Sequence, residues 1–446
     1  MLNYDVIIIG GGVAGYSAGM QCLEHGLKTA IISSGQSALH FSSGSIDLLS
    51  HSPITNQPIR SPLKEIAKLD QQLPNHPYAK LGVDKVLNAL DWFQAKMQDE
   101  GLPLSKLDSL QNHYRITTMG TLKPTWLSQP FVRKIDYSFD NLKGIKRIVM
   151  LSVQGFRDFQ PQIAQDNLKR YTEFSAIPIE TINVTLTAFG QLNRNPHDFR
   201  SIDISRILRN DHQFKEFADQ LMSAANTDDL VVLPSIMGNG DGLTLLNKLK
   251  GYTKLNFHEV PTMPPSLLGI RIEDTMMRTF IKNGGGLHKG DEVLKGNFEE
   301  DNGTLTLTSV QTKKMAELPL SAKHFIFATG SFFSKGLIAQ QQQILEPVFD
   351  LDMCDIGERP DWHQGEFFSP NPHEFLSFGV QTDERFLPSI QGKKVSNLFC
   401  AGAVLSDYNP ISHGCGSGVA ISTAFNAVEN IITDRTEAMQ LKEATV

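Results

Sequence analysis

The chain has 446 residues, of which 40% are apolar and 20% charged, as in a globular protein of two or three structural units. A net charge of −7 argues against nucleic acid as a partner. The four cysteines form no CxxC pair, so the usual zinc and iron–sulfur spacings are missing and we expect no metal centre. No apolar run reaches the ~18 residues of a spanning helix, which predicts a cytoplasmic chain, or one held at a membrane by another protein.

Residues 4–9 (YDVIII) predict a buried parallel strand, 13–25 a helix and 29–32 a second strand. Gly10, Gly12 and Gly15 stand between the first strand and the helix in the spacing GxGxxG. The first glycine permits a tight turn, the second lets a phosphate approach the backbone, and the third lets the helix pack on the strand. The pattern predicts a phosphate-binding loop at a helix N-terminus, with a turn that binds nothing as the alternative.

The second strand ends without the acidic residue that usually holds an adenosine ribose. Ser33, Ser34 and Gly35 occupy that place. NAD is therefore disfavoured as the main ligand. FMN lacks the adenosine and becomes a serious alternative to FAD, with the two serine hydroxyls as candidate cofactor contacts.

Further elements follow in chain order. The middle of the chain predicts an α/β unit of its own, with a loop or short helix at 52–72, helices at 83–101 and 160–170, strands at 146–153 and 229–233, and an extended segment at 172–187. The last part predicts a helix at 265–283, a hairpin at 296–311, strands at 325–328 and 398–401, and a final helix of about fifteen residues after 414–418.

A second set of glycines follows the late strands. Thr329 and Gly330 end one strand and Gly402 ends the other, while Gly414, Gly416 and Gly418 open the final helix. Bare N–H groups at a helix start suit the negative charge of a reduced flavin, and the alternative is a glycine-rich helix start packed on the sheet. Together with the first loop, this ordered set resembles the glutathione-reductase-type flavoproteins, in particular the succinate dehydrogenase and fumarate reductase branch. Ala403 departs from that pattern, because an acidic residue usually stands there.

A narrower resemblance extends over nearly the whole chain. Six segments resemble the B subunit of the bacterial anaerobic glycerol-3-phosphate dehydrogenases: 36–50, 120–128, 154–159, 264–271, 328–334 and 378–388. The resemblance implies an FMN-binding subunit that pairs with a larger, FAD-bearing one. It also implies docking on an iron–sulfur subunit, which anchors the pair at the cytoplasmic face of the inner membrane. The implied reaction oxidises sn-glycerol 3-phosphate to dihydroxyacetone phosphate and passes electrons to quinone.

The expected fold class is α/β, with a Rossmann-like FAD/NAD(P)-binding domain of the glutathione-reductase type and an inserted α/β cap domain. Residues 1–50, 255–345 and 375–446 are expected to form the flavin-binding domain. Residues 51–254 form the inserted cap or partner-binding domain, and 346–374 a connecting loop region.

Three residues are candidates for catalysis. His413 precedes the glycine loop and is the best-placed general base, while the fork of Arg271 suits a phosphate. By the resemblance, His40, with Ser42 and Ser43 in the same loop, lies near the flavin, and a covalent bond to it is a further alternative. The plain alternatives are a solvated loop histidine for His413, a surface helix cation for Arg271 and a structural histidine for His40.

Two other functions stay open at this point. One is a non-catalytic electron relay or stabilising subunit of the same complex. The other is a stand-alone flavin oxidoreductase that acts on a different hydroxy acid.

Overall fold

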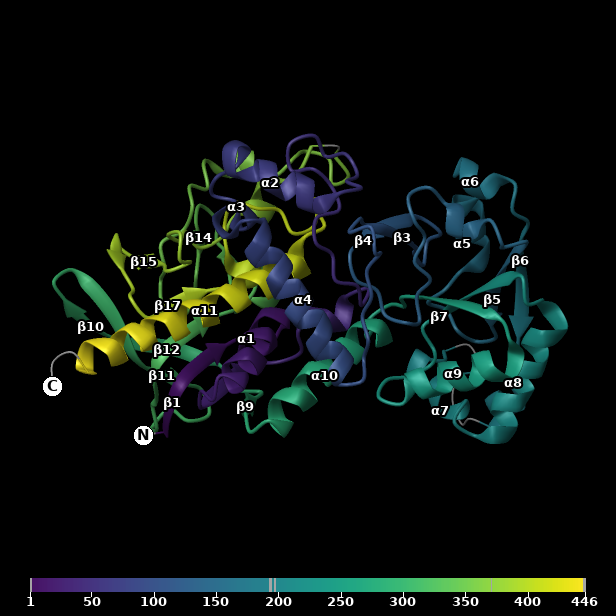
Figure 1. The fold of residues 1–446 in the computed structure, drawn as a ribbon, viewed down its shortest axis with the longest axis horizontal. Helices are drawn as coiled ribbons and strands as arrows, with labels where there is room; N and C mark the ends of the chain where they lie inside the picture. The colour runs from purple at the N-terminus through teal and green to yellow at the C-terminus, as the bar shows by residue number, and fades with distance from the viewer. Residues whose placement is uncertain (1, 192–194, 196–197, 370, 444–446) are drawn as a thin grey trace. The chain divides into compact units, whose positions relative to one another are not determined.

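The computed structural model describes residues 2–191, 195, 198–369 and 371–443 (Figure 1). The chain forms two compact units. Unit 1 comprises Met1–Ala38, Asp47–Lys96 and Met276–Val446, and unit 2 comprises Leu39–Ile46 and Met97–Thr275. Two of the boundaries fall inside α-helices, namely α4 (Val83–Asp99) and α10 (Leu267–Lys282), and a third falls inside the 3₁₀ helix η1 (Ala38–Phe41).

Unit 1 is built on a seven-stranded sheet of order β10-β11-β12-β1-β2-β9, with β17 also paired to β12. Its strands are β1 (Leu2–Ile9), β2 (Thr29–Ser33), β9 (Gly286–Lys289), β10 (Val293–Asp301), β11 (Thr304–Thr312), β12 (Leu320–Phe327) and β17 (Leu398–Cys400). The central strand β1 pairs in parallel with β12 and β2, so that Ile9 lies opposite Phe327 and Ile32. Its apolar run is continuous because both faces of the strand are buried.

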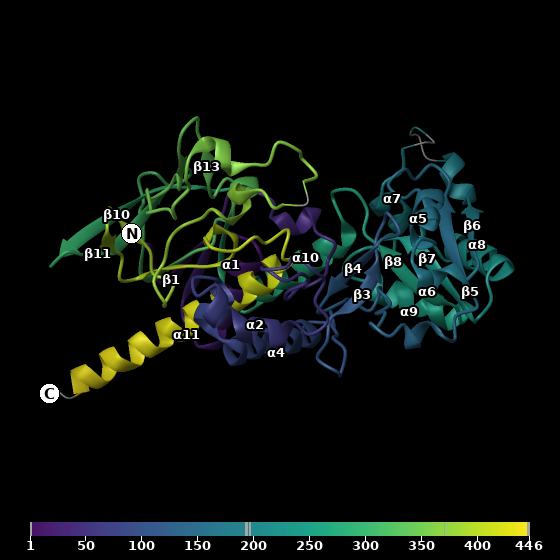
Figure 2. The ribbon, with the colours of Figure 1, turned by 90° about the horizontal axis from the view of Figure 1, so that it is seen from above.

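The helices of unit 1 are α1 (Val13–Glu24), α2 (Pro62–Gln72), α3 (Pro77–Leu81), most of α4, the end of α10 and α11 (Gly416–Glu443). The purple α1 and the yellow α11 pack side by side (Figure 1). The last turns of α11 extend beyond the body of the unit (Figure 2). The expected length of about fifteen residues for the final helix is wrong, because α11 runs for 28 residues. No glycine or proline interrupts the helix after Gly418, so nothing ends it early.

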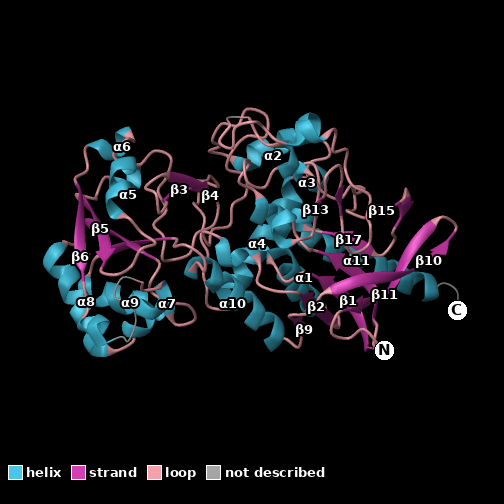
Figure 3. Cartoon of the chain, turned by 180° about the vertical axis from the view of Figure 1, so that it is seen from behind, coloured by secondary structure: helices cyan, strands magenta, loops and turns pink. Residues whose placement is uncertain are grey.

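Unit 2 contains a parallel sheet of order β6-β5-β7-β8. Its strands are β5 (Arg147–Val153), β6 (Ile179–Val184), β7 (Asp229–Pro234) and β8 (Asn256–Val260). Its helices are α5 (Pro161–Leu168), α6 (Thr172–Ser175), α7 (Ser201–Ile207), α8 (Asp211–Ala224), α9 (Gly242–Thr253) and most of α10. Figure 3 shows this sheet in magenta among its cyan helices.

Short elements complete the structure. The remaining strand pairs are β3 (His113–Ile116) with β4 (Leu122–Thr125), β13 (Ile338–Ala339) with β14 (Ile344–Leu345), and β15 (Ser389–Ile390) with β16 (Lys393–Lys394). The 3₁₀ helices are η1 (Ala38–Phe41), η2 (Asp140–Leu142), η3 (Thr187–Gln191), η4 (Phe332–Ser334), η5 (Arg359–Trp362), η6 (Glu374–Ser377) and η7 (Gly402–Val404). None of the described helices combines the length and hydrophobicity that crossing a bilayer requires.

The expected α/β fold class is confirmed, and the central β1–α1–β2 unit has the predicted bounds to within two residues. The expectation of one extended segment at 172–187 is wrong, because this range begins with the helix α6 and only β6, later in the range, is a strand. Strands β8 and β9 were not expected from the sequence. The inserted domain expected at 51–254 stays a prediction. The compact units have other bounds, because Asp47–Lys96 is grouped with unit 1 and unit 2 continues to Thr275.

Candidate functional site

The glycine loop after β1 is fixed by its own packing at two of the three glycines of the GxGxxG spacing. Gly10 has φ +119, and a Cβ there would lie 2.1 Å from the carbonyl oxygen of Ala328. A Cβ on Gly15 would lie 1.9 Å from the carbonyl oxygen of Gly10. These two positions therefore require glycine for the fold itself, whether or not a ligand is bound.

Gly12 differs from its neighbours, because a Cβ there would meet only the Cβ of Ser37, at 4.0 Å. It is the N-cap of α1, which has no side-chain cap and no acidic residue in its first turn. The N–H groups of that turn have no acceptor within the helix. Open space above an uncapped helix N-terminus is the arrangement that a flavin phosphate requires, so the residues present fit the expected cofactor.

Ser33 ends β2 directly against this loop. Its hydroxyl donates to the carbonyl of Gly35 at 3.2 Å, and its oxygen lies 2.7 Å from where a Cβ of Gly11 would stand. Ser34, the next residue, is exposed. The hydroxyl of Ser33 thus occupies the position where the sequence predicts a ribose contact.

The late strands bring Thr329, Gly330 and Gly402 to the same edge of the sheet. Because β12 and β17 run parallel to β1, their carboxyl ends lie beside Gly10. The hydroxyl of Thr329 is buried and has no hydrogen-bond partner within the described residues. A Cβ on Gly402 would lie 3.1 Å from the Cβ of Ala14, in the first turn of α1. The expected cofactor residues of unit 1 that follow β1, β12 and β17 therefore gather at one place.

The glycines before and within α11 divide into two kinds. Gly414 and Gly418 donate their N–H groups to Ile411 and Asp47, so these amides are occupied. A Cβ on Gly418 would lie 2.2 Å from the hydroxyl of Tyr78, which gives that glycine a packing role. The expectation of a loop of bare N–H groups is correct only for Gly416 and Ser417, whose amides make no hydrogen bond within the described residues.

His413 is held in place by the chain segment that follows residue 47. Its carbonyl accepts the N–H groups of Ser50 at 2.8 Å and His51 at 3.1 Å. Burial, followed by the charge of His51, lowers the pKa of His413 to about 4, so the ring is neutral at pH 7. The N–H of Asn409 donates to Nδ1 at 3.3 Å, which leaves the ring proton on Nε2. His413 thus presents a donor, and its role as a base stays a prediction.

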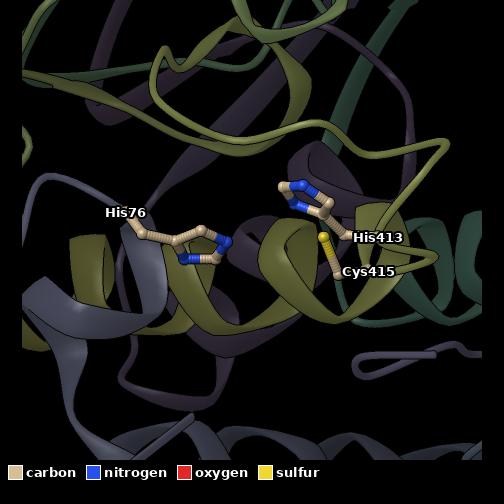
Figure 4. Close-up of side chains that lie close together, drawn as sticks. All are labelled: His76, His413 and Cys415. Carbon is tan, nitrogen blue, oxygen red and sulfur yellow. The ribbon is translucent and has the colours of Figure 1, made fainter. Parts of the chain in front are cut away.

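His413 lies with His76 and Cys415 in a cluster whose possible metal-ligating atoms are within 4.8 Å of one another (Figure 4). Nδ1 of His76 accepts the N–H of Tyr78 at 3.0 Å, so its proton also stands on Nε2. Burial raises the pKa of Cys415 far above its usual value, which keeps the thiol protonated. In the structure both Nδ1 atoms are occupied by backbone N–H groups, and the thiol of Cys415 lies 3.9 Å from the carbonyl oxygen of Asn409.

Tyr408 and Asn409 add two buried hydrogen-bond donors beside this cluster, and the sequence reasoning missed both residues. The ring of Tyr408 lies 5.9 Å from that of His76, and its hydroxyl has no hydrogen-bond partner in the described part of the chain. Nδ2 of Asn409 and Nε2 of His76 lack partners there as well, whereas Oδ1 of Asn409 accepts the N–H groups of Ile411 and Ser412. Sequence reasoning could have found them, because Tyr408 and Asn409 lie close to His413 in the sequence. A buried tyrosine usually finds a hydrogen-bond partner for its hydroxyl, so Tyr408 was a candidate to lie beside another polar group.

The buried histidines predict loss of stability in acid. Burial, with the neighbouring His413, lowers the pKa of His76 from 6.5 to about 3. The unfolded chain therefore binds this proton more readily, and the free energy of unfolding should fall as the pH drops from 6.5 towards 3. In His76→Asn the amide oxygen can still accept from Tyr78, but no ring titrates. Melting curves from pH 7 to pH 4 should show a shallower decline for this variant.

The control for this measurement is His25→Asn, which removes an exposed ring. It should follow the parent curve. Equal declines in all three proteins would show that His76 does not govern the acid response.

Arg271 lies in unit 2, in α10, and is 3% exposed, so its interpretation as a surface cation is wrong. Its guanidinium forms a bidentate pair with Glu259, with NH1 at 2.6 Å from Oε2 and NH2 at 3.4 Å from Oε1. Nε donates to the carbonyl of Gly238, and the group lies over the ring of Phe131 at 3.6 Å. The fork that would take a phosphate is thus occupied by a carboxylate.

Glu259 itself was missed by the sequence reasoning. It is fully buried in β8 and accepts the N–H groups of Ile236 and Met237 at 3.1 and 2.9 Å. The carboxylate therefore fills the loop after β7, at the carboxyl ends of the parallel strands of unit 2. An internal anion stands where such sheets often bind a phosphate.

His40, Ser42 and Ser43 also belong to unit 2. Nε2 of His40 lies 3.1 Å from Oε2 of Glu273, and Nδ1 is buried without a hydrogen-bond partner among the described residues. The hydroxyl of Ser42 accepts the N–H of Gly44 at 3.2 Å, and that of Ser43 accepts from Lys123 at 3.1 Å. The expected site residues thus fall into two groups, and the proximity of this second group to a flavin stays a prediction.

Comparison with known proteins defines the class first. The FAD binding domain family matches residues 5–419, so the chain is a flavoprotein of the FAD-binding type. The B subunit of the anaerobic glycerol-3-phosphate dehydrogenase of Vibrio vulnificus is 48% identical over 444 residues, covering 100% of this chain and 98% of the relative. The corresponding protein of Vibrio cholerae is 47% identical, covering 99% of each chain, and that of Actinobacillus pleuropneumoniae is 37% identical, covering 96% and 99%. The chain belongs to the family of anaerobic glycerol-3-phosphate dehydrogenase B subunits.

Two solved structures are reported for comparison. The 3-ketosteroid Δ1-dehydrogenase of Sterolibacterium denitrificans is 10% identical, with a TM-score of 0.44 over 97% of this chain and 100% of that one. The quinol fumarate reductase of E. coli is 9% identical, with a TM-score of 0.41 over 97% and 70%.

Proposed function

We propose that this chain is the flavin-bearing subunit of an sn-glycerol-3-phosphate:quinone oxidoreductase, in which glycerol 3-phosphate is oxidised to dihydroxyacetone phosphate. The observation that carries the proposal is the open space at Gly12, above the uncapped N-terminus of α1, in a member of the B-subunit family. When bound, a flavin supplies the two-electron acceptor that oxidation of an alcohol to a ketone requires.

The residues of unit 1 would hold the flavin at two points. The first-turn amides of α1 bind its phosphate, with the hydroxyl of Ser33 beside them. The amides of Gly416 and Ser417, at the N-terminus of α11, supply donors and the positive end of a helix dipole for negative charge on the ring system.

The identity of the flavin is a separate part of the proposal. The family match favours FAD, whereas Ser33 and Ala403, in place of two carboxylates, favour FMN. A charged hydrogen bond contributes about 1.5–3 kcal/mol, so without these carboxylates the adenosine half of FAD is bound more weakly. We expect FMN when flavin released from the purified chain by heat is separated by chromatography. One equivalent of FAD per chain would contradict this expectation and leave the flavin site itself intact.

His413 is the residue that we place at the reacting alcohol. Oxidation of the alcohol releases a proton, and a neutral imidazole can accept it at a free nitrogen. The backbone N–H of Asn409 holds Nδ1 by a long bond of 3.3 Å, and Nε2 carries the ring proton. His413 can therefore take up the proton of the alcohol only at Nδ1, where the alcohol has to replace the N–H of Asn409.

A second candidate function is favoured by two side chains of unit 2 that are already paired with carboxylates. Arg271 is paired with Glu259, and His40 with Glu273, so neither expected catalytic side chain is at the disposal of a substrate. A chain that binds flavin and passes electrons from the FAD-bearing partner to the iron–sulfur partner, without meeting the substrate, agrees with this arrangement.

Anaerobic mixing of the flavin-loaded chain with sn-glycerol 3-phosphate distinguishes the two. Rapid bleaching of the flavin, with no bleaching by the enantiomer, supports direct oxidation by this chain. A flavin that dithionite reduces but glycerol 3-phosphate does not would contradict direct oxidation and support the relay. A chain without flavin after reconstitution would contradict both.

The membrane attachment that we propose depends on other proteins of the complex. The FAD-bearing partner pairs with this chain, while the iron–sulfur partner holds the pair at the cytoplasmic face of the inner membrane. In cells that lack the iron–sulfur partner, we expect the chain to move from the membrane pellet to the supernatant after ultracentrifugation. Its retention in the pellet would show that it binds the membrane by itself.

A further inference from the structure

A hollow of about 500 Å³ opens in unit 2, beside the first residues of β8. Pro130, Val132 and Arg133 form one wall, and the end of α9 forms another. The first wall is fixed along the edge of β8. The carbonyl of Phe131 accepts the N–H of Glu259 at 2.8 Å, and the N–H of Arg133 donates to Nδ1 of His258 at 3.1 Å. The volume is that of a small-molecule site.

The charges of this hollow have one sign. Arg133, Lys250 and Lys254 line it, and none of its eight lining residues is acidic. Burial lowers the pKa of Arg133 and of Lys250, as expected for cations that are withdrawn from water without a carboxylate to offset the cost. Three cations around one hollow create a positive potential that selects an anion.

The dipole of helix α9 accounts for the position of only two of the three cations that line the hollow. Lys250 lies in the last turn of the helix and Lys254 is its C-cap, where cations are favoured without any ligand. Arg133 lies outside α9, so that argument does not apply to it. One of its terminal nitrogens donates to the carbonyl of Asn141, and Nε has no hydrogen-bond partner within the described residues. Because Nε is itself buried, the second terminal nitrogen is the one donor of this guanidinium that is open to a ligand in the described part of the chain.

A second hollow, in unit 1, shows the contrast. It measures about 200 Å³ and places Lys80 with Asp355 and Asp407. The ammonium of Lys80 donates to the carbonyl of Thr382 at 2.8 Å. The lysine of that hollow is already hydrogen-bonded and stands beside two carboxylates, so the hollow has no preference for an anion.

We propose that the hollow of unit 2 binds a small phosphate monoester, with Arg133, Lys250 and Lys254 around the phosphate. The open terminal nitrogen of Arg133 gives the phosphate one charge-assisted hydrogen bond, and the ammonium groups of the two lysines balance the remaining charge. Val132, Leu255 and Phe257 provide an apolar wall for the organic part of the ligand. None of these residues is among the flavin residues of unit 1, and the site does not rest on the proposed function.

Calorimetric titration of the full-length, flavin-loaded protein tests the proposal. The probes are inorganic phosphate and sn-glycerol 3-phosphate, at low and constant ionic strength. Lys250→Met keeps the apolar stem and removes the charge, and it should weaken binding of both probes about tenfold or more. Arg133→Gln should have a similar effect. The matched control is Lys248→Met on the same helix, because Lys248 pairs with Asp211 at the surface. It should leave the affinity within about twofold.

Each outcome decides the matter. Loss of binding in Lys250→Met and Arg133→Gln, with the control unchanged and the flavin content of all variants equal, supports the site. Tighter binding of the ester than of inorganic phosphate shows that the apolar wall contributes. Absence of binding to the parent chain, or equal weakening by Lys248→Met, overturns the proposal. Flavin reduction is a separate readout, so a chain that binds the ester but is not reduced by it leaves the site standing.

Discussion

Gly12→Val is expected to remove the flavin from the protein and leave the fold intact. A Cβ at this position meets no protein atom closer than 4.0 Å, so the variant has room in the empty protein. The two added methyl groups then occupy the space through which a phosphate reaches the first turn of α1. We expect flavin affinity to fall at least about tenfold, measured as flavin absorbance per chain after gel filtration.

Two further variants make this result specific. Gly15→Ala should fail to give folded protein, because its Cβ would lie 1.9 Å from the carbonyl oxygen of Gly10. Gly144→Val adds the same side chain at an exposed glycine with open surroundings and should keep its flavin. Normal flavin content in Gly12→Val would place the phosphate elsewhere.

Arg271→Ala is expected to destabilise unit 2 by about 3–5 kcal/mol, because it leaves the carboxylate of Glu259 buried without its partner. That carboxylate also anchors the N–H groups of Ile236 and Met237, so the loop after β7 should loosen with it. Chemical denaturation gives the loss of stability, and hydrogen exchange of the two amides shows where it occurs.

The control is Arg209→Ala, whose bidentate pair with Asp241 lies at the surface, where such pairs contribute about 0–1 kcal/mol. Arg271→Lys separates structure from catalysis. A buried structural arginine predicts lower stability in this variant, since lysine cannot form the fork. Unchanged stability with a raised KM for glycerol 3-phosphate would instead restore Arg271 as a substrate ligand.

The parts of the fold that the sequence predicts are those in which local pattern and burial agree. The run YDVIII has one interpretation, since six largely apolar residues before GxGxxG fit a strand buried on both faces. β8 lacks such a pattern. Its sequence NFHEV places a histidine and a glutamate in the interior, where only tertiary contacts satisfy them. Strand β9 is short and half-buried, and its pairing with β2 defines it more than its composition does.

The site shows the same division. The role predicted for Gly12 follows from its spacing alone and stays a prediction, and the structure leaves open space at this residue. The role of Arg271 does not follow from its spacing, because its helical spacing gives no sign of Glu259, which comes from the strand that the pattern missed. The glycines at 414–418 are similar in sequence, yet Gly418 accommodates Tyr78 while Gly416 leaves its amide open. Whether a glycine serves packing or ligand binding is decided by the residues around it in the folded protein, and the sequence alone does not show them.

The order of pairing in unit 1 has a consequence for biosynthesis. Asn3 in β1 is paired with Ser321 in β12, and 318 residues separate them. At roughly 5–20 residues per second, the ribosome needs roughly 15–65 seconds to supply that partner strand. Unit 2 ends at Thr275 and can close in the meantime, while β1 and β2 wait with their apolar faces exposed. Exposed apolar strands of this kind are prone to aggregation during the interval, and the loop at Gly10 is complete only after Ala328, on which it packs, has been synthesised.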